Sequence, residues 1–174
     1  MKDSNHTFTR TLLIIGMMLL AAFSRLIPHP ANFTAVLAVA LFGGAKFKNL
    51  SLAILVPLIV MMTTDLVIGF YSLMPFVYGC IVLTAIIGMY IGRTSNPVYI
   101  LFGSLLASTL FFMVTNATVW YHNPQFAQTF SGLLICYDFA IPFFRNQLFG
   151  DLFFNMLLFG SFYIVKNKIP SLAY

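Results

Sequence analysis

The chain has 174 residues, of which 60% are hydrophobic and only 7% are charged. Because a soluble domain carries about 25% charged residues, this composition excludes a protein whose whole surface faces water. The net charge of +5 does not indicate nucleic acid as a partner, since the basic residues are scattered between apolar runs and form no basic, aromatic face.

The apolar runs predict one all-α membrane domain, residues 1–174, that crosses a lipid bilayer six times. A membrane-spanning helix needs roughly 20 residues, and short polar or proline-containing turns separate six apolar runs. The first run is interpreted as an uncleaved helix rather than a signal peptide, because the rest of the chain is itself polytopic. Residues 121–145, with two prolines, predict only a partial helix around 130–139. The six predicted helices cover residues 11–26, 33–45, 50–68, 75–91, 98–120 and 147–165.

The distribution of charge predicts the orientation of this six-helix molecule. With an even number of crossings both termini lie on one side, and two basic residues, Arg25 and Arg145, fall on the other. The excess of basic residues makes the first side cytoplasmic. Three of the four acidic residues lie towards the outer side. The basic residues on the predicted cytoplasmic side are Lys2, Arg10, Lys46, Lys48, Arg93, Lys166 and Lys168.

Polar and aromatic side chains gather at the predicted outer ends of the helices. Such a face predicts a binding pocket, where aromatic rings supply contact area and polar groups fix the orientation of a ligand. An ionisable group in a membrane-spanning region is costly and marks a functional site by default. The residues of this outer face are Arg25, His29, Asn32, Asp65, Tyr71, Tyr78, Cys80, Asn116, Trp120, Tyr121, His122, Asp138, Arg145, Asn146 and Asp151.

Several of these residues have a structural interpretation that stays open. Trp120 and Tyr121 suit interfacial anchoring as well as ligand contact. The charged residues could pair with one another and hold helices together, which is the preferred interpretation for Arg145 and Asp151, near the start of the predicted sixth helix. Asp65, at the end of a long apolar run, is expected to line the pocket.

Cys80 is the sharpest candidate for chemistry. A buried free cysteine is most often an inert small hydrophobe, and this interpretation applies to Cys80 and Cys136 alike. Cys80 differs because it follows Tyr78 near the start of a predicted helix, one loop from Asp65. A helix N-terminus favours the thiolate, which is a soft ligand for a transition metal. No Walker A, CxxC, HExxH or Gly-x-Ser-x-Gly motif occurs, so any metal is expected to arrive within a ligand.

Three segments carry a resemblance to a known family: SRLIPHPANFTAVLAVALFGG, DLVIGFYSLMPFVYGC and GLLICYDFAIPFFRNQLFGDLFF. They resemble the substrate-binding S-components of energy-coupling factor vitamin transporters. More narrowly, they are similar to a group of small bacterial S-component-like proteins that includes solitary cobalamin transporters. The resemblance covers nearly the whole chain. It implies a multi-pass transporter that binds a vitamin at its outer face and carries no cofactor of its own.

The resemblance also implies roles for single residues. In the cobalamin-transporting branch, a cysteine in this loop-to-helix region ligates the cobalt of the corrin. That cysteine can displace the upper cyanide, which gives reductive decyanation beside transport. Cys80 matches it by motif and would be both cobalt ligand and catalytic residue. The substrate-binding residues that the resemblance implies by motif are His29, Asn32, Asp65 and Tyr78. The outer-face pattern adds, as further predicted substrate-binding residues, Tyr71, Asn116, Trp120, Tyr121 and Asp138.

Other functions stay open. The ligand could be another vitamin or a precursor, the chain could be a membrane enzyme that uses its thiol, or it could be a structural subunit without a ligand. The energising module of the transporter family is also an open partner. S-components generally dock on that module through an Ala-x-x-x-Ala pattern in the first helix, whereas here Ala21 and Ala22 are adjacent and lack that spacing.

Overall fold

The computed structural model describes residues 2–92 and 96–169, with side chains from residue 7 onward. This part of the chain contains six α-helices and a single 3-10 turn, and no strand. The prediction of an all-α chain is therefore confirmed. The helices are α1 (Lys2–Phe23), α2 (Val36–Lys46), α3 (Leu50–Ile68), α4 (Met74–Ile91), α5 (Pro97–His122) and α6 (Phe130–Lys168), and the 3-10 turn η1 (Ser24–Leu26) follows α1.

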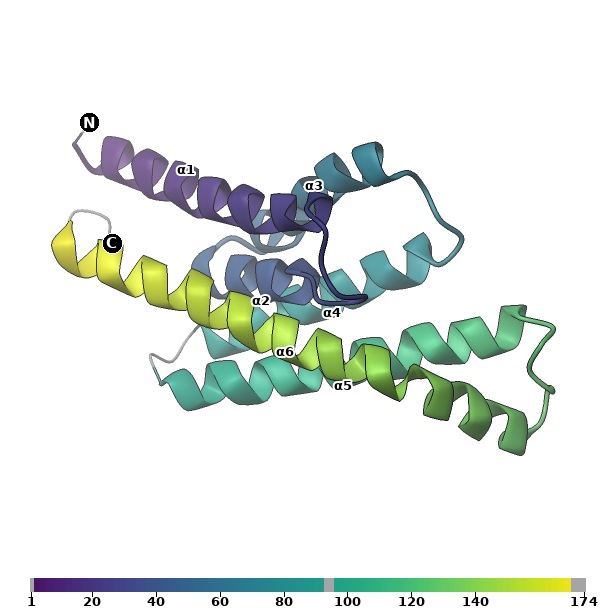
Figure 1. The fold of residues 1–174 in the computed structure, drawn as a ribbon. Coiled ribbons are helices and arrows are strands. Elements are labelled where there is room, and N and C mark those ends of the chain that lie inside the picture. Colours follow the sequence, from purple (N-terminus) through teal and green to yellow (C-terminus); the bar gives the residue numbers. More distant parts are fainter. Residues whose placement is uncertain (1, 93–95, 170–174) are drawn as a thin grey trace.

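Five of these helices are long and apolar enough to cross a membrane, which is typical of a multi-pass membrane protein. The exception is α2, which has 11 residues. The six predicted crossings therefore correspond to five long helices and one short apolar helix that is enclosed by the others (Figure 1).

Both terminal helices lie at one end of the bundle, because α1 begins and α6 ends on the same side in Figure 1. We call this the terminal end. The loops at residues 27–35, 69–73 and 123–129 face the opposite end, which we call the loop end. Basic residues gather at the terminal end. Arg10 Nη2 donates to the carbonyl of Lys46 at 3.1 Å, and the Lys46 ammonium lies 4.9 Å from the ring centre of Phe159. Arg93, which the sequence assigns to this end, lies outside the described residues.

The short helix α2 is the centre of the structure, and every residue from Ala35 to Gly44 is buried. It packs against α4 through small residues. A Cβ added to Gly44 would lie 2.0 Å from the carbonyl oxygen of Ala85, and one added to Gly88 would lie 2.3 Å from that of Leu41. Small residues let helix backbones approach closely where lipid provides no hydrophobic drive for association. The two helices therefore touch backbone to backbone.

The last helix differs most from the sequence prediction. Instead of a partial helix followed by a helix over 147–165, α6 runs without interruption from Phe130 to Lys168 and contains Pro142. Thr129 caps its start by accepting the backbone N–H of Gly132 at 3.2 Å. Proline is tolerated inside membrane helices because neighbouring groups satisfy the freed carbonyl. The first helix also differs, since it begins at Lys2 and becomes a 3-10 turn after Phe23.

The contact between α2 and α4 predicts that the stability lost on replacing a glycine of α4 depends strongly on which glycine is replaced. We expect Gly88→Ala to lower the free energy of unfolding by about 1–3 kcal/mol, because the added methyl group meets backbone rather than a mobile side chain. The thermal unfolding midpoint of the detergent-solubilised protein measures this. The matched control is Gly79→Ala in the same helix, where an added Cβ meets nothing within 4 Å. Equal midpoints for the two variants would contradict the close approach.

Candidate ligand pocket at the loop end

A buried ion pair joins α1 to α3 at the loop end. Arg25, in the turn η1, places its Nη1 atom 2.8 Å from Oδ1 of Asp65, and the two side chains are 11% and 1% exposed. The same nitrogen donates to Thr64 Oγ1 at 2.6 Å. Charged groups this deeply buried persist when they are paired and hydrogen-bonded. The structural interpretation of Arg25 and Asp65 as partners is thus confirmed.

Two tyrosines, Tyr71 and Tyr78, lie next to this ion pair. The Tyr78 hydroxyl donates to Oδ2 of Asp65 at 2.8 Å and thereby ties α4 to α3. Tyr71, in the loop between these helices, is half-buried. Burial, and then the neighbouring Asp65 carboxylate, raise the pKa of the Tyr71 phenol. A raised pKa keeps the phenol protonated, so Tyr71 can donate a hydrogen bond to a ligand.

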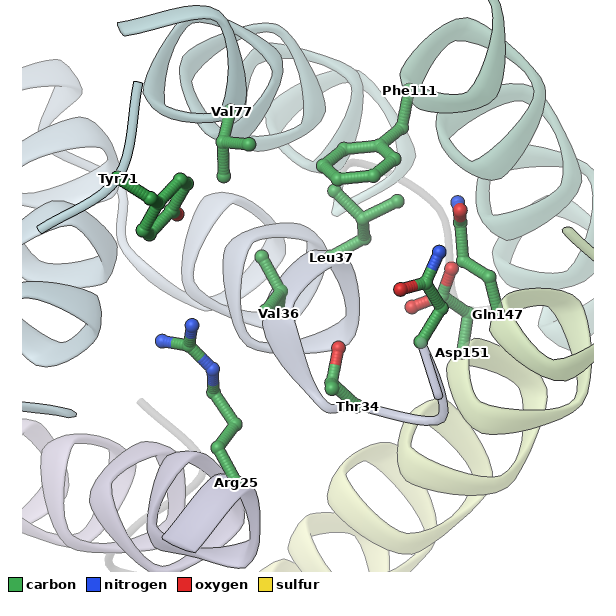
Figure 2. A pocket seen from close by; sticks show the side chains of 10 residues that line it. Arg25, Thr34, Val36, Leu37, Tyr71, Val77, Phe111, Gln147 and Asp151 are labelled. Atoms are coloured by element: carbon green, nitrogen blue, oxygen red, sulfur yellow. The ribbon is translucent and has the colours of Figure 1, made fainter. Parts of the chain in front are cut away.

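Two cavities that share lining residues lie beside these residues and the N-terminal residues of α2, and Figure 2 shows the residues that line the smaller one. Their volumes are about 140 and 270 Å³. Figure 2 shows Arg25 and Tyr71 on one side of the smaller cavity, with Phe111, Gln147 and Asp151 on the other. The residues that line both cavities are Asn32, Tyr71, Val77, Phe111 and Gln147. The two cavities thus share walls and form one site, which we call the loop-end pocket.

The loop before α2 gives the pocket a polar corner. Asn32 lies in the left-handed region with φ 63°, which asparagine adopts more readily than most residues. The backbone N–H of Thr34 donates to the Asn32 carbonyl at 3.0 Å. From α6, Asn146 Nδ2 donates to the carbonyl of Ala31 at 3.0 Å. This loop is therefore held against α6, and it presents Asn32 and Thr34 to the pocket.

A row of hydrogen-bonded polar side chains extends from the pocket between α5 and α6. Ser108 Oγ lies 2.7 Å from Oδ2 of Asp151, and Gln147 Nε2 donates to the Ser108 carbonyl at 3.1 Å. One turn further, Asn155 Nδ2 donates to Ser104 Oγ at 3.0 Å. All five side chains are at most 5% exposed. The structural role expected for Asp151 is thus met by a partner on another helix, Ser108 on α5, whereas Arg145 places its guanidinium 5.9 Å from the ring centre of Phe149.

The structure brings some of the predicted site residues into the pocket and leaves others outside it. Asn32, Tyr71 and Asn116 line it. Asp65 and Tyr78 lie behind its wall, where Asp65 contacts Arg25 and Tyr78 contacts Asp65.

The remaining predicted contacts lie elsewhere at the loop end. His29 is exposed, and its Nδ1 atom contacts the carbonyl of Ile27 at 2.6 Å. Trp120 donates its indole N–H to the carbonyl of Ala127 at 2.9 Å, in the turn between α5 and α6. Tyr121 and Asp138 are exposed near the same turn. A ligand would meet these residues only by extending beyond the pocket.

Cys80 is buried in the second turn of α4 and is 3% exposed. It does not belong to the lining of either cavity, whereas Val77, one turn earlier in the same helix, lines both. The effect of a helix N-terminus on an anion falls off within the first turn, so α4 gives a thiolate at this position little help. Cys136, on α6, is equally buried, and its Sγ atom lies 3.6 Å from the carbonyl of Asn116.

Sequence reasoning missed Thr34, Phe111 and Gln147 as lining residues. For Gln147 a signal was present, because it shares a spacing of four with Asp151 and Asn155 on α6. Ser104 and Ser108 have the same spacing on α5. Residues four apart lie on one face of a helix, so two polar faces inside apolar helices indicate a shared polar contact.

The ion pair predicts how Asp65 contributes to stability. We expect Asp65→Ala to lower the free energy of unfolding by about 3–5 kcal/mol, because it leaves the Arg25 guanidinium buried and unpaired. The double variant Arg25→Met, Asp65→Leu should recover most of that loss, since it removes both charges. Thermal unfolding in detergent measures both variants, with the exposed Asp138→Ala as control. A midpoint for Asp65→Ala equal to that of the control would exclude the pairing.

The sequence matches a known protein family over nearly its whole length. Residues 5–172 match a family described as "Family of unknown function (DUF6580)". Neither the curated proteins nor the solved structures contained a match to the chain. Since the matched region covers nearly all residues, the chain belongs to the DUF6580 family.

Proposed function

We propose that this protein is a multi-pass transporter of the bacterial inner membrane that binds cobalamin or a related corrinoid in the loop-end pocket. One observation carries the proposal. The three segments that resemble S-component-like transporters are far apart in the sequence, yet each contributes lining residues to the same pocket. Asn32 comes from the first segment, Tyr71 and Val77 from the second, and Gln147 and Asp151 from the third.

The gathering of basic residues at the terminal end supports an orientation for this transporter. Under the positive-inside rule the terminal end is cytoplasmic, so the loop-end pocket opens to the outer side of the membrane. A vitamin arriving from outside would then meet the pocket first. No energising partner is required by this proposal, and the missing Ala-x-x-x-Ala spacing in α1 fits either a different docking surface or a transporter that works alone.

Cys80 is the proposed cobalt ligand, with its thiolate as the soft donor. For cobalt to reach Sγ, the residues between the thiol and the pocket must give way. Two lining residues are near Cys80 in the sequence: Val77 is one turn earlier on α4, and Tyr71 belongs to the loop between α3 and α4. We therefore propose that binding a corrinoid moves the loop at residues 69–73 together with the first turn of α4.

The size of the pocket favours a second candidate of the same class. Pockets for small ligands usually measure about 300–1,000 Å³, and the two cavities measure about 140 and 270 Å³. A vitamin or precursor smaller than a corrinoid fits this space with less movement of the loops. In this alternative, Arg25, Tyr71 and Gln147 orient the ligand, and Cys80 stays an inert part of the core.

The absorption spectrum of bound corrinoid separates these functions. We expect protein purified after growth with cyanocobalamin to carry a corrinoid spectrum that differs from free cyanocobalamin, because sulfur replaces a ligand of cobalt. Cys80→Ser should lose that difference or lose the pigment. Cys136→Ser is the matched control, since Cys136 is as buried as Cys80 but lies on α6. An identical spectrum in Cys80→Ser and wild type would exclude the thiolate as ligand.

Uptake provides the second test of the proposal. We expect the gene to restore growth on limiting cyanocobalamin in a bacterium that needs cobalamin and lacks its own inner-membrane uptake. The substitution Asn32→Leu should reduce this rescue, because it replaces a polar lining residue of both cavities. Rescue by wild type with no pigment on the purified protein would favour weak binding. Failure of rescue by a protein that is present in the membrane would favour another ligand.

A further inference from the structure

The proposed function counts Asp151 among the lining residues but gives its carboxyl group no chemical role. Its carboxyl group lines the smaller cavity and is 1% exposed, although it lies within a helix long enough to cross the membrane. An ionisable side chain in such a position is costly and is normally paired with an opposite charge. The hydrogen-bond partners of Asp151 are instead neutral: the Ser108 hydroxyl at 2.7 Å and the Gln147 side chain.

The charged and titratable groups around Asp151 can be named element by element. From α5 it contacts the neutral Ser108 hydroxyl. On its own helix, α6, its neighbour is the neutral Gln147 (Figure 2). The loop before α2 contributes Asn32 and Thr34 to the shared cavity, which are also neutral. The ionisable residues that line this cavity with Asp151 are Arg25 and Tyr71. Since Arg25 already forms an ion pair with Asp65 at 2.8 Å, it is committed to another carboxylate.

The contacts of Ser108 show how this site can hold a proton. Its Oγ atom lies 2.9 Å from the carbonyl of Ser104 and 2.7 Å from Oδ2 of Asp151. A hydroxyl group has a single proton to donate, so it can serve one of these two acceptors at a time. When Asp151 carries a proton, Asp151 donates to Ser108 and Ser108 donates to Ser104. When Asp151 is ionised, the Ser108 proton turns to the carboxylate.

From this geometry we propose that Asp151 is a proton-binding site in the wall of the loop-end pocket. The Ser108 hydroxyl rotates to suit either protonation state, so the proton can come and go without rearrangement of α5 or α6. With the proton bound, the charges at the pocket cancel, because Arg25 and Asp65 neutralise each other. Without it, the site carries one negative charge in a buried position.

The same arrangement couples the proton to a ligand. A molecule of low polarity that fills the pocket replaces water in the cavity that Asp151 lines, and this loss of nearby water disfavours the ionised form of the carboxyl. Ligand binding and proton binding therefore favour each other, and the effect is reciprocal. This coupling rests on the proposed function, whereas the proton site itself does not.

Infrared spectroscopy of the ligand-free protein tests the proton site directly. The chain has four acidic side chains, all of them aspartate, so the C=O stretch of a protonated carboxyl group can be assigned by substitution. We expect this band in wild type at mildly acidic pH, where exposed carboxyl groups are ionised, and we expect it to disappear in alkaline buffer. Asp151→Asn should abolish the band, and Asp138→Asn, at an exposed position of α6, should leave it unchanged.

A second variant keeps the test independent of folding defects in Asp151→Asn. Ser108→Ala retains the carboxyl but removes its hydrogen-bond partner, so we expect the band to persist at a shifted frequency. Absence of the band from wild type at mildly acidic pH would show a permanent carboxylate and overturn the proposal. Persistence of the band in Asp151→Asn would do the same, as would an unshifted band in Ser108→Ala.

Cyanocobalamin binding at several pH values then tests the coupling. We expect the affinity of wild type to fall as pH rises, by about tenfold per pH unit at most because one proton is linked. Asp151→Asn imitates the protonated form and should bind independently of pH. Equal pH dependence in both proteins would overturn the coupling. If neither protein binds cyanocobalamin at any pH, the proposed function fails, and the infrared result still decides the proton site.

Discussion

The close approach of α2 and α4 is the constraint on which the rest of the molecule depends. Gly44 and Gly88 allow these backbones to touch, and any side chain there would push the central helix away from its neighbour. Because α2 is too short to cross a bilayer, its position is set by the long helices around it. Its N-terminal residues Val36 and Leu37 form part of the pocket lining. The depth of the pocket is thus a consequence of how tightly two glycine-containing helices pack.

The sequence predicted the helices that are marked by their own hydrophobicity and turn residues. It failed for the helix whose continuity depends on contacts with another helix. The apolar runs gave α3 and α4 almost to the residue, because hydrophobicity and turn residues mark both ends. The run that forms α6 contains Pro142, and a proline inside a helix removes a backbone hydrogen bond, so the sequence predicted a break there. In the structure α6 continues through Pro142, and side chains on both sides of it contact α5: Tyr137 donates to the Met113 carbonyl and Gln147 to the Ser108 carbonyl.

The pocket residues were likewise predictable only in part. Asn32, Tyr71 and Asn116 could be predicted as lining residues because their helix ends share one face of the molecule. The partner of Asp151 could not be predicted from proximity in sequence. Residues 145 and 151 are separated by more than one and a half helical turns, which turns their side chains away from each other. The partner lies 43 positions away on α5, and only the spacing of four on both helices indicated it.

The length of α6 has a mechanical consequence. Its 39 residues span about 58 Å at about 1.5 Å per residue, whereas a bilayer with its headgroups is about 40–45 Å thick. A helix of this length that crosses the membrane must project beyond it, and its partner α5 accompanies it at the loop end (Figure 1). The tip, with Tyr121 and Phe130 largely exposed, then stands above the lipid. Pro142 lies between this tip and the pocket residues Gln147 and Asp151, and helices commonly bend at proline. A partner that binds the tip could therefore pivot the outer part of α6 about Pro142 relative to the part that lines the pocket.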